Sequence, residues 1–263
     1  MKWSQANIKN EFKFKKKYGQ NFIFNQTLIE NIVEKANVAK DDIVIEIGAG
    51  VGSLTCGLAP KVKKVVTYEI DHELEETLKK NMVEFNNVEI KMTDFLKEDF
   101  SFLKQEAVIV ANLPYSITTP ILFKIIDESI LVKKLVIMVQ KEVGERIAAK
   151  PNSKSYNALS VLLNHQYKIK KLMDIGKNNF YPIPKVESIV LEMVKKDTRI
   201  DNKFKKLVKD SFRQKRKTIK NNLKLYDLEK IEKVLSKNNY SLNSRAEQIP
   251  IEVFVELSEE LGE

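Results

Sequence analysis

The stretch IVIEIGAGVG at residues 43–52 decides the fold of this chain. Its apolar first half, Ile43–Ile47, predicts a buried strand, and the glycines that follow predict a tight turn into a helix over Ser53–Ala59. The alternation continues along the chain, so we expect an α/β fold with a Rossmann-like, mostly parallel sheet covered by helices on both faces. The further expected helices are Asn25–Ala36 and Glu73–Asn81, and the further expected strands are Val65–Ile70, Val88–Met92, Ala107–Ala111, Leu135–Val139, Tyr167–Asp174 and Glu187–Lys195.

The glycine turn indicates a ligand other than a dinucleotide. Its pattern is Gly-x-Gly-x-Gly, because Ser53 stands where the dinucleotide pattern has its third glycine. Glu46, two residues before the first glycine, would repel a pyrophosphate. It would instead attract a ligand that carries a sulfonium and an ammonium group, which favours S-adenosylmethionine.

Two more carboxylates follow the next two expected strands. Glu69 ends the second strand, 21 residues after Gly48, which is where a carboxylate holds a ribose diol. Asp94 follows the third strand and can accept a hydrogen bond from an adenine amino group. Any one acid alone is better explained as a solvated or capping carboxylate. Three acids at the ends of successive strands together favour a nucleoside site.

The tetrapeptide Asn112-Leu113-Pro114-Tyr115 directly follows the expected strand Ala107–Ala111. An Asn side-chain oxygen and the carbonyl of the residue before Pro can accept both hydrogens of an exocyclic amino group, which makes its nitrogen more nucleophilic. The ring of Tyr115 can stack on a base drawn out of its helix. A simple strand-to-loop turn would use the same residue types. Its place downstream of the glycine turn favours methylation of an adenine N6.

Composition excludes several classes of protein. The 263 residues contain one cysteine, Cys56, and two histidines, His72 and His165, far apart in the sequence. This excludes an internal disulfide and argues against a Cys- or His-based metal site. No apolar run approaches the roughly 20 residues that span a membrane, and we expect no signal peptide. We therefore expect a monomer in the cytoplasm, with no bound metal and no membrane partner.

Positive charge is concentrated near the C-terminal end. Residues 195–224 hold 13 Lys or Arg against 3 Asp or Glu, whereas the rest of the chain holds 32 basic and 33 acidic residues. A polyanionic partner explains this concentration better than a solvated helix face does. The pattern is helical from Asp201 onward. We expect a cofactor-binding catalytic domain over 1–198, which begins with a mobile basic arm over 1–17, and a helical RNA-binding domain over 199–263.

Together these motifs resemble the rRNA adenine dimethyltransferases over nearly the whole chain. The resemblance implies the sheet of a class I methyltransferase with a small helical C-terminal domain. Besides the glycine turn, Asp94 and Asn112–Tyr115, it rests on Lys17–Phe22, Glu69–Asp71, Ile117–Pro120, Gln140–Val143, Pro151–Tyr156, Phe180–Ser188, Phe212–Asn221 and Arg245–Glu247.

Two branches of that family compete. One modifies small-subunit rRNA during ribosome biogenesis, and the other modifies large-subunit rRNA and confers macrolide resistance. Gln140–Val143, Pro151–Tyr156 and the Arg-Lys-Thr-Ile segment at 216–219 are similar to the small-subunit branch. The implied reaction is S-adenosylmethionine-dependent dimethylation of N6 of two adjacent adenosines in the 3′-terminal hairpin of 16S rRNA. The implied partner is this rRNA or an immature 30S subunit.

The resemblance also implies a role for individual residues. Asn112, Leu113 and Tyr115 would serve the target adenine. Phe180 would be a second stacking face, unless it is a core aromatic. The cofactor would contact Asn21, Ile23, Gly48, Glu69, Asp94 and Asn112, and the RNA would contact Phe180, Arg213, Lys215, Arg216, Lys217 and Lys220.

Two other functions remain open from the sequence. A DNA adenine N6-methyltransferase shares the Asn-x-Pro-Tyr chemistry, although the Gln20-Asn21-Phe22 segment and the basic C-terminal stretch favour RNA. A ribosome-assembly factor would need RNA binding alone. The intact Gly48 and Asn112 argue against lost catalysis without excluding a second, assembly-checking role.

Overall fold

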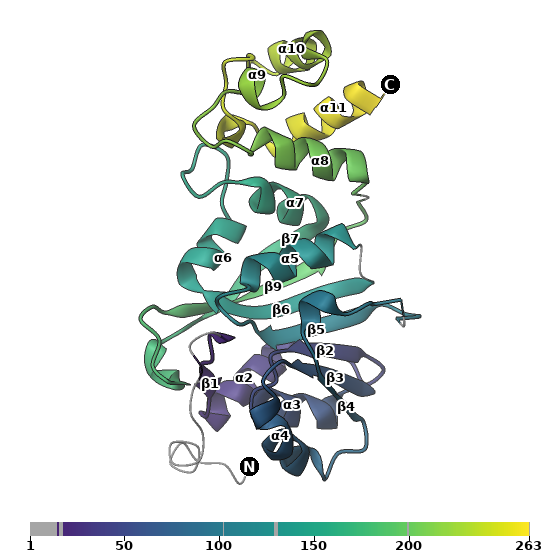
Figure 1. Cartoon of the computed structure of the whole chain (residues 1–263), viewed down its shortest axis with the longest axis vertical. Helices are drawn as coiled ribbons and strands as arrows, with labels where there is room; N and C mark the ends of the chain where they lie inside the picture. The colour runs from purple at the N-terminus through teal and green to yellow at the C-terminus, as the bar shows by residue number, and fades with distance from the viewer. Residues whose placement is uncertain (1–14, 16–17, 102, 129–130, 199, 263) are drawn as a thin grey trace. The chain divides into compact units, whose positions relative to one another are not determined.

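The computed structural model describes residues 15, 18–101, 103–128, 131–198 and 200–262 (Figure 1). Apart from Lys15, the expected mobile arm over 1–17 therefore lies largely outside the described residues. The chain splits into two compact units. The first unit comprises Met1–Ile125, Ser129–Gly144 and Lys170–Val194, and the second comprises Ile126–Glu128, Glu145–Ile169 and Lys195–Glu263. The expected division of the chain near residue 198 stays a prediction.

A seven-stranded sheet in the order β4-β3-β2-β5-β6-β9-β7 forms the framework. Four neighbouring pairs from β4 to β6 are parallel, and β9 runs antiparallel to β6. This mostly parallel sheet confirms the expected fold class. Its strands are β2 (Ile43–Ile47), β3 (Lys64–Glu69), β4 (Val88–Met92), β5 (Ala107–Asn112), β6 (Val132–Gln140), β7 (Tyr167–Ile175) and β9 (Ser188–Lys195).

Helices connect the strands and extend the chain beyond them. Those that follow or precede strands of the sheet are α2 (Gln26–Ala36), α3 (Ser53–Leu58), α4 (Glu75–Met82), α5 (Thr118–Asp127), α6 (Lys141–Ile147) and α7 (Ala158–Gln166). The C-terminal helices are α8 (Asn202–Ser211), α9 (Ile219–Asn222), α10 (Leu228–Lys237) and α11 (Ile251–Gly262). Among the described residues, no helix is long and apolar enough to cross a membrane.

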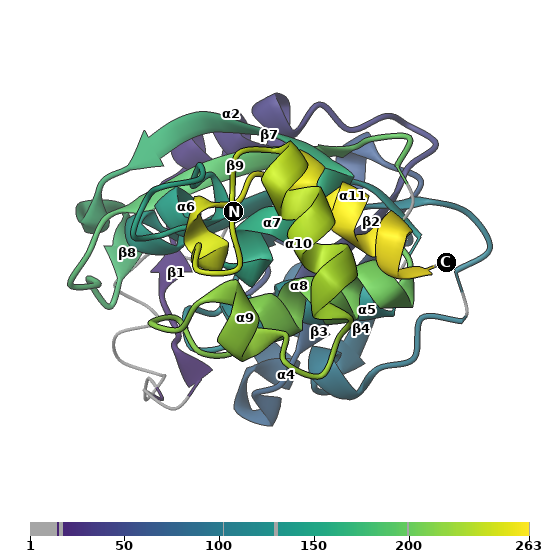
Figure 2. The ribbon, with the colours of Figure 1, turned by 90° about the horizontal axis from the view of Figure 1, so that it is seen from above.

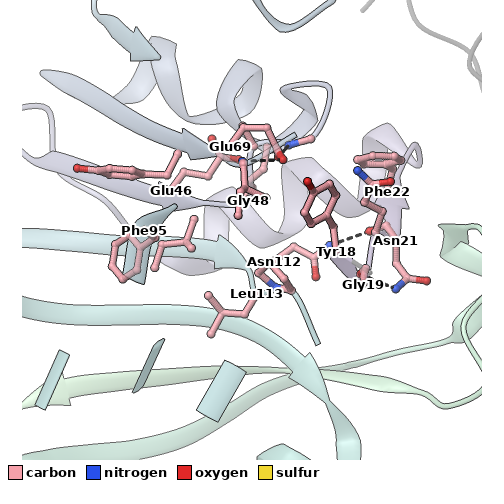
Figure 3. A pocket seen from close by; sticks show the side chains of 18 of the residues that line it. Tyr18, Gly19, Asn21, Phe22, Glu46, Gly48, Glu69, Phe95, Asn112 and Leu113 are labelled. Atoms are coloured by element: carbon pink, nitrogen blue, oxygen red, sulfur yellow. Dashed lines mark hydrogen bonds between the residues drawn. The ribbon is translucent and has the colours of Figure 1, made fainter. Parts of the chain in front are cut away.

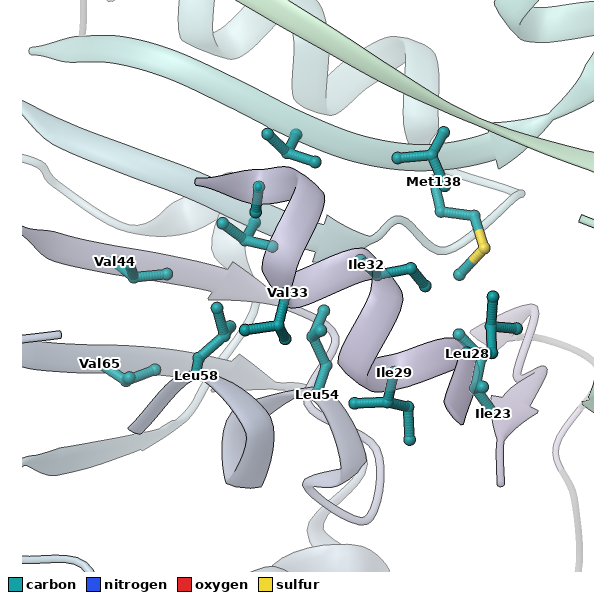
Figure 4. Close-up of a cluster of buried hydrophobic side chains, with 14 of the residues drawn as sticks. Ile23, Leu28, Ile29, Ile32, Val33, Val44, Leu54, Leu58, Val65 and Met138 are labelled. Carbon is teal, nitrogen blue, oxygen red and sulfur yellow. The ribbon is translucent and has the colours of Figure 1, made fainter. Parts of the chain in front are cut away.

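The core of the first unit lies between α2, α3 and the sheet (Figure 4). Helix α2 begins at the Asn25 side chain, which accepts the N–H of Leu28. Its apolar side chains recur at the three- and four-residue spacing of one helix face. They pack on Leu54 and Leu58 of α3 and on strand residues such as Val44. The same cluster includes Phe180, which belongs to the short two-stranded sheet of β1 (Phe22–Ile23) and β8 (Phe180–Tyr181).

In the second unit, α8 packs on α7 and α11, and α10 packs on α11 (Figure 2). Phe204, Leu207, Val208 and Ser211 are buried, as expected for one apolar helix face. The side chain of Phe212 follows this face and contacts the rings of Tyr156 and Phe254, with centroids 5.9 and 5.8 Å away.

One expectation about the second unit is wrong. The helical pattern was expected to continue past Ser211, but residues 212–218 form a loop, here named the basic loop. The side chain of Asn222 stabilises this loop through hydrogen bonds to its main chain. Its Nδ2 donates to the carbonyl of Ser211 at 2.7 Å, and its Oδ1 accepts the N–H of Gln214 at 3.1 Å. Adjacent like charges further disfavour a helix here.

Candidate active site

A pocket opens where β2, β3, β4 and β5 end, and it gathers the predicted site residues (Figure 3). Parallel strands bring their carboxyl ends to one edge of a sheet, which is where an open α/β fold binds its ligand. The lining includes all the residues predicted to contact the cofactor, and all those predicted to contact the target base except Phe180, namely Asn21, Ile23, Gly48, Glu69, Asp94, Asn112, Leu113 and Tyr115.

The glycine turn is shaped by close contacts on both sides. Gly48 has a φ of 81°, in the left-handed region, and its N–H donates to the carbonyl of Tyr68 at 2.8 Å. A Cβ on Gly50 would lie 2.5 Å from the ring of Phe22. Larger residues would therefore displace the β1 segment that borders the pocket.

Glu69 holds this turn with its carboxylate. Its Oε2 accepts the N–H of Gly50 at 2.8 Å, and its Oε1 accepts the N–H groups of Ile70 and Asp71 at 2.9 Å each. Burial raises the pKa of Glu69, and these amide hydrogen bonds oppose that rise. The carboxylate retains lone pairs beyond these three bonds. It is thus able to hold a ribose diol while it also shapes the glycine turn.

Glu46 is buried beneath the turn. It accepts hydrogen bonds from the hydroxyls of Thr55 and Thr67, the latter at 2.8 Å. Burial raises the pKa of Glu46 to about 7, although the two threonines lower it, and nearby Glu69 adds to the rise. A cation bound in the pocket would favour the ionised form, which suits the sulfonium and ammonium groups of S-adenosylmethionine.

Asn112 ends β5 with its side chain in a fixed orientation. Its Nδ2 donates to the main-chain carbonyl of Asn21 at 2.9 Å (Figure 3). Only the NH₂ end of the amide can make this bond, so Oδ1 takes the opposite direction. Among the described residues, this buried Oδ1 has no hydrogen-bond partner. A buried acceptor without a donor is costly, and a ligand amino group would satisfy it.

The rest of the tetrapeptide is also anchored. The N–H of Leu113 donates to the carbonyl of Met138 at 3.1 Å, and the carbonyl of Pro114 accepts the N–H of Ile117. The hydroxyl of Tyr115 lies 2.7 Å from that of buried Ser188. Burial raises the pKa of Tyr115, so the ring stays neutral. These contacts orient a half-buried aromatic ring at the pocket.

Asp94 follows β4 and lines the pocket. Its Oδ1 accepts the N–H of Leu96 at 2.9 Å and so caps the short turn Phe95–Lys97. The structure thus gives this side chain both a capping role and a place at the pocket.

The predicted RNA contacts divide into two groups. Phe180 is only 1 % exposed and belongs to the core cluster, which corrects its assignment as a second stacking face. The basic residues lie in the second unit and are exposed: Arg213, Lys215, Arg216 and Lys217 in the basic loop, and Lys220 in α9. Lys215 donates to the carbonyl of Lys154 at 2.6 Å.

Some residues at the site were missed from the sequence. Tyr18 and Gln20 line the pocket, and Asp71 binds Gln20 through a hydrogen bond of 2.7 Å. Gln20 and Asp71 stand inside motifs quoted for the resemblance, but no local pattern connects two segments so far apart. Ser188 was visible only as the last residue of such a motif. Among the described residues, no cluster of His, Cys, Asp or Glu could hold a metal ion.

Comparisons with known proteins agree with this geometry. Residues 11–263 match the family model described as ribosomal RNA adenine dimethylase. The chain is similar to the protein named ribosomal RNA small subunit methyltransferase A in Thermotoga neapolitana, with 43% identity over 98% of this chain and 95% of that protein. The protein of the same name in Clostridium botulinum (strain Langeland) is 40% identical, over 95% of each chain.

Solved structures extend the comparison to the fold. A dimethyladenosine transferase from Plasmodium falciparum superposes with a TM-score of 0.75 and 28% identity, over 90% of this chain and 95% of that one. The 23S rRNA methyltransferase ErmE superposes with a TM-score of 0.72 and 22% identity, over 92% of this chain and 100% of that one. At that identity the second likeness concerns the fold alone.

Proposed function

The chain belongs to the ribosomal RNA adenine dimethylase family, and we propose that it dimethylates two adjacent adenosines in the 3′-terminal hairpin of small-subunit rRNA. It is an rRNA adenine N6,N6-dimethyltransferase that depends on S-adenosylmethionine. The observation that carries the assignment is the buried Oδ1 of Asn112, which has no hydrogen-bond partner among the residues that the structure describes and lies in the pocket near the glycine turn.

The residues present fit the cofactor. Glu69 and Asp94 would hold the ribose and the adenine amino group, and buried Glu46 would offset positive charge. Gly48 would allow the backbone to approach closely, and Asn21 and Ile23 would border the cofactor. When bound, S-adenosylmethionine would supply an electrophilic methyl group.

The chain's own residues prepare the target nitrogen. The N6 lone pair of adenine is delocalised into the ring, so the amino group is a weak nucleophile. Oδ1 of Asn112 accepts one amino hydrogen and the carbonyl of Leu113 accepts another, which makes the nitrogen more tetrahedral and more nucleophilic. The ring of Tyr115 stacks on the base and excludes water from one of its faces.

The similarity to named relatives favours small-subunit rRNA over large-subunit rRNA as the substrate. The proteins named for the small subunit are 40 to 43% identical to this chain. We infer that the substrate is this rRNA or an immature 30S particle, bound by a monomer in the cytoplasm through the basic residues of the second unit.

The test is transfer of labelled methyl groups to purified rRNAs and subunits. Label should appear as N6,N6-dimethyladenosine at two adjacent positions near the 3′ end of small-subunit rRNA. Label found mainly in large-subunit rRNA would overturn the assignment.

A further inference from the structure

The segment Tyr18–Asn21 makes hydrogen bonds to two parts of the site. Its Asn21 carbonyl accepts from the side-chain amide of Asn112, and its Gln20 side chain donates to Asp71, which lies just after β3. Its residues line the pocket, and Gly19 packs closely against the tetrapeptide. A Cβ at Gly19 would lie 3.3 Å from Oγ of Ser116 and 3.4 Å from the main-chain nitrogen of Tyr115. The segment therefore lies against the end of the tetrapeptide at Gly19.

Asp71 anchors the same segment from the other side. Its Oδ2 accepts a hydrogen bond from Nε2 of Gln20 at 2.7 Å, and its Oδ1 accepts one from Nζ of Lys15 at 2.6 Å. Asp71 is only 2% exposed. Burial alone would raise its pKa, but the hydrogen bonds from Lys15 and Gln20 hold it below its ordinary value. The carboxylate is therefore ionised and committed to these donors.

The anchor is itself part of the cofactor site. The N–H of Asp71 donates to Oε1 of Glu69 at 2.9 Å. A continuous series of hydrogen bonds and peptide links thus runs from Glu69 through Asp71 and Gln20 to the carbonyl of Asn21, and from there to Nδ2 of Asn112. Every hydrogen bond in this series is between 2.7 and 2.9 Å long.

We propose that Gln20 and Asp71 are positioning residues: they hold the Asn21 carbonyl where it turns Oδ1 of Asn112 toward the target amino group. The inference rests on the proposed function of Asn112 and adds how its orientation is set. Without the anchor, the Asn21 carbonyl would move and the amide of Asn112 would rotate freely. Misplacement of a catalytic group by about 1 Å costs on the order of 10²-fold in rate.

Gln20→Met tests the proposal, because it keeps the length of the side chain and removes the donor to Asp71. Single-turnover methyl transfer is measured with cofactor and RNA both saturating. We expect a rate about 10²-fold below that of the wild type. Asp71→Leu should slow transfer as well. The rate of the double variant should be no lower than that of the slower single variant, because both substitutions remove the same hydrogen bond between Gln20 and Asp71.

Gln26→Met is the matched control. Gln26 donates to Glu30 at 2.9 Å on the exposed face of α2, so the same substitution breaks the same kind of bond away from the pocket. This variant should transfer methyl groups at the wild-type rate. Hydrogen exchange of the main-chain amides of residues 18–23, read without substrate, should be faster in Gln20→Met only.

The outcomes separate this inference from the proposed function. Rates are expressed relative to the wild type on whichever rRNA the wild type methylates. If the wild-type enzyme does not methylate small-subunit rRNA, the proposed substrate is wrong. The rate of each variant relative to the wild type can still be measured on the rRNA that is methylated. A Gln20→Met enzyme with an unchanged rate at saturation, or one altered only in cofactor affinity, overturns the positioning role.

Discussion

Nδ2 of Asn112 donates to the carbonyl oxygen of Asn21 at 2.9 Å, although the two residues are 91 positions apart in the sequence. This single bond decides which end of the amide faces the pocket. The pocket is thus lined by an acceptor, whereas a rotated amide would present a donor. The chemistry proposed for the tetrapeptide therefore depends on a segment that precedes the first strand of the large sheet.

Asn112→Ala should lower single-turnover methyl transfer by at least about 10²-fold, the cost of removing one preorganised polar group from an active site. RNA binding, measured by filter retention, should persist because the basic residues lie in the second unit. Asn86→Ala, at an exposed position, is the control and should leave the rate unchanged. A near-normal rate in Asn112→Ala would exclude the proposed role of the amide.

Asn112→Asp separates the two ends of the side chain. The carboxylate keeps an acceptor for the target but cannot donate to the Asn21 carbonyl, and the two oxygens repel each other. We expect transfer to fall nearly as far as in the alanine variant. Full activity in the Asn112→Asp variant would mean that the bond to Asn21 has no part in orienting the acceptor.

Glu69→Ala should weaken S-adenosylmethionine binding by on the order of 2–3 kcal/mol, because it removes the charge-assisted hydrogen bonds that we propose Glu69 makes to the ribose. The same change also frees three main-chain N–H groups of the turn. Isothermal calorimetry checks the affinity, with Glu76→Ala on the exposed face of α4 as the control. Unchanged affinity would remove Glu69 from the cofactor site.

Much of the sheet could be predicted because its signal is local. Ile43–Ile47 and Val88–Met92 are strands with the expected bounds, since short apolar runs between turns admit few other structures. Their order along one edge then brought Glu69, Asp94 and Asn112 to a common pocket.

The rest depends on contacts between distant segments. Nothing near Phe180 in the sequence distinguishes an aromatic that stacks on a base from one that packs beneath α2. The loop after Ser211 depends on Asn222, eleven residues later, which competes with the helix for main-chain groups. Lys205 belongs to the basic stretch 195–224, but its side chain is buried and donates to the carbonyl of Asp127 at 2.9 Å.

Tyr115→Phe and Tyr115→Ala should differ in their effects on transfer. Phenylalanine keeps the stacking ring and loses only the hydrogen bond to Ser188. The rate of transfer should therefore fall slightly, and the free energy of unfolding should fall by about 1–3 kcal/mol. Alanine removes the ring, which is worth about 1–3 kcal/mol of base stacking. Single-turnover rates and thermal melting check both. Equal rates in the two variants would argue against stacking.

Cofactor affinity should depend on pH through Glu46. The free protein holds this carboxyl with a pKa of about 7, so it is largely protonated at pH 6. A bound sulfonium stabilises the ionised form and lowers the pKa, so binding should release a proton between about pH 5 and 7 and strengthen as the pH rises. Calorimetry in buffers of different ionisation enthalpy measures the release. The Glu46→Gln variant should lack the proton release that comes from Glu46. An identical release in that variant would assign the proton to another group.

The raised pKa of Glu46 also makes the stability of the folded protein depend on pH. The folded protein binds this proton more tightly than the unfolded chain, whose carboxyl has a pKa near 4.5. The free energy of unfolding of the cofactor-free protein should therefore lose a contribution as the pH rises from about 4.5 through 7. Chemical denaturation at pH 5 and pH 8 checks this, with Glu46→Gln expected to reduce the difference.

The basic loop and α9 should supply much of the RNA affinity. Several lysines of the basic stretch are engaged within the fold: Lys206 pairs with Asp210, and Lys209 pairs with Asp127. By contrast, the structure shows no hydrogen bond or ion pair from the side chains of Arg213, Arg216 or Lys220 to the described residues, and all three are exposed. Their charges are therefore available to phosphates.

Replacing Arg213, Arg216 and Lys220 by Ala should flatten the dependence of RNA affinity on salt. Each phosphate contact releases counterions, so log affinity falls with log salt by about 0.7–0.9 per contact, and the slope should drop by about two to three units. Filter binding over a salt series measures it. The triple variant Lys61→Ala, Lys79→Ala, Lys80→Ala removes the same charge from exposed positions of the first unit and should keep the wild-type slope. Cofactor affinity should be unchanged in both, because none of these residues lines the pocket. If both triple variants show the same slope, net charge alone governs binding and the basic loop makes no specific phosphate contacts.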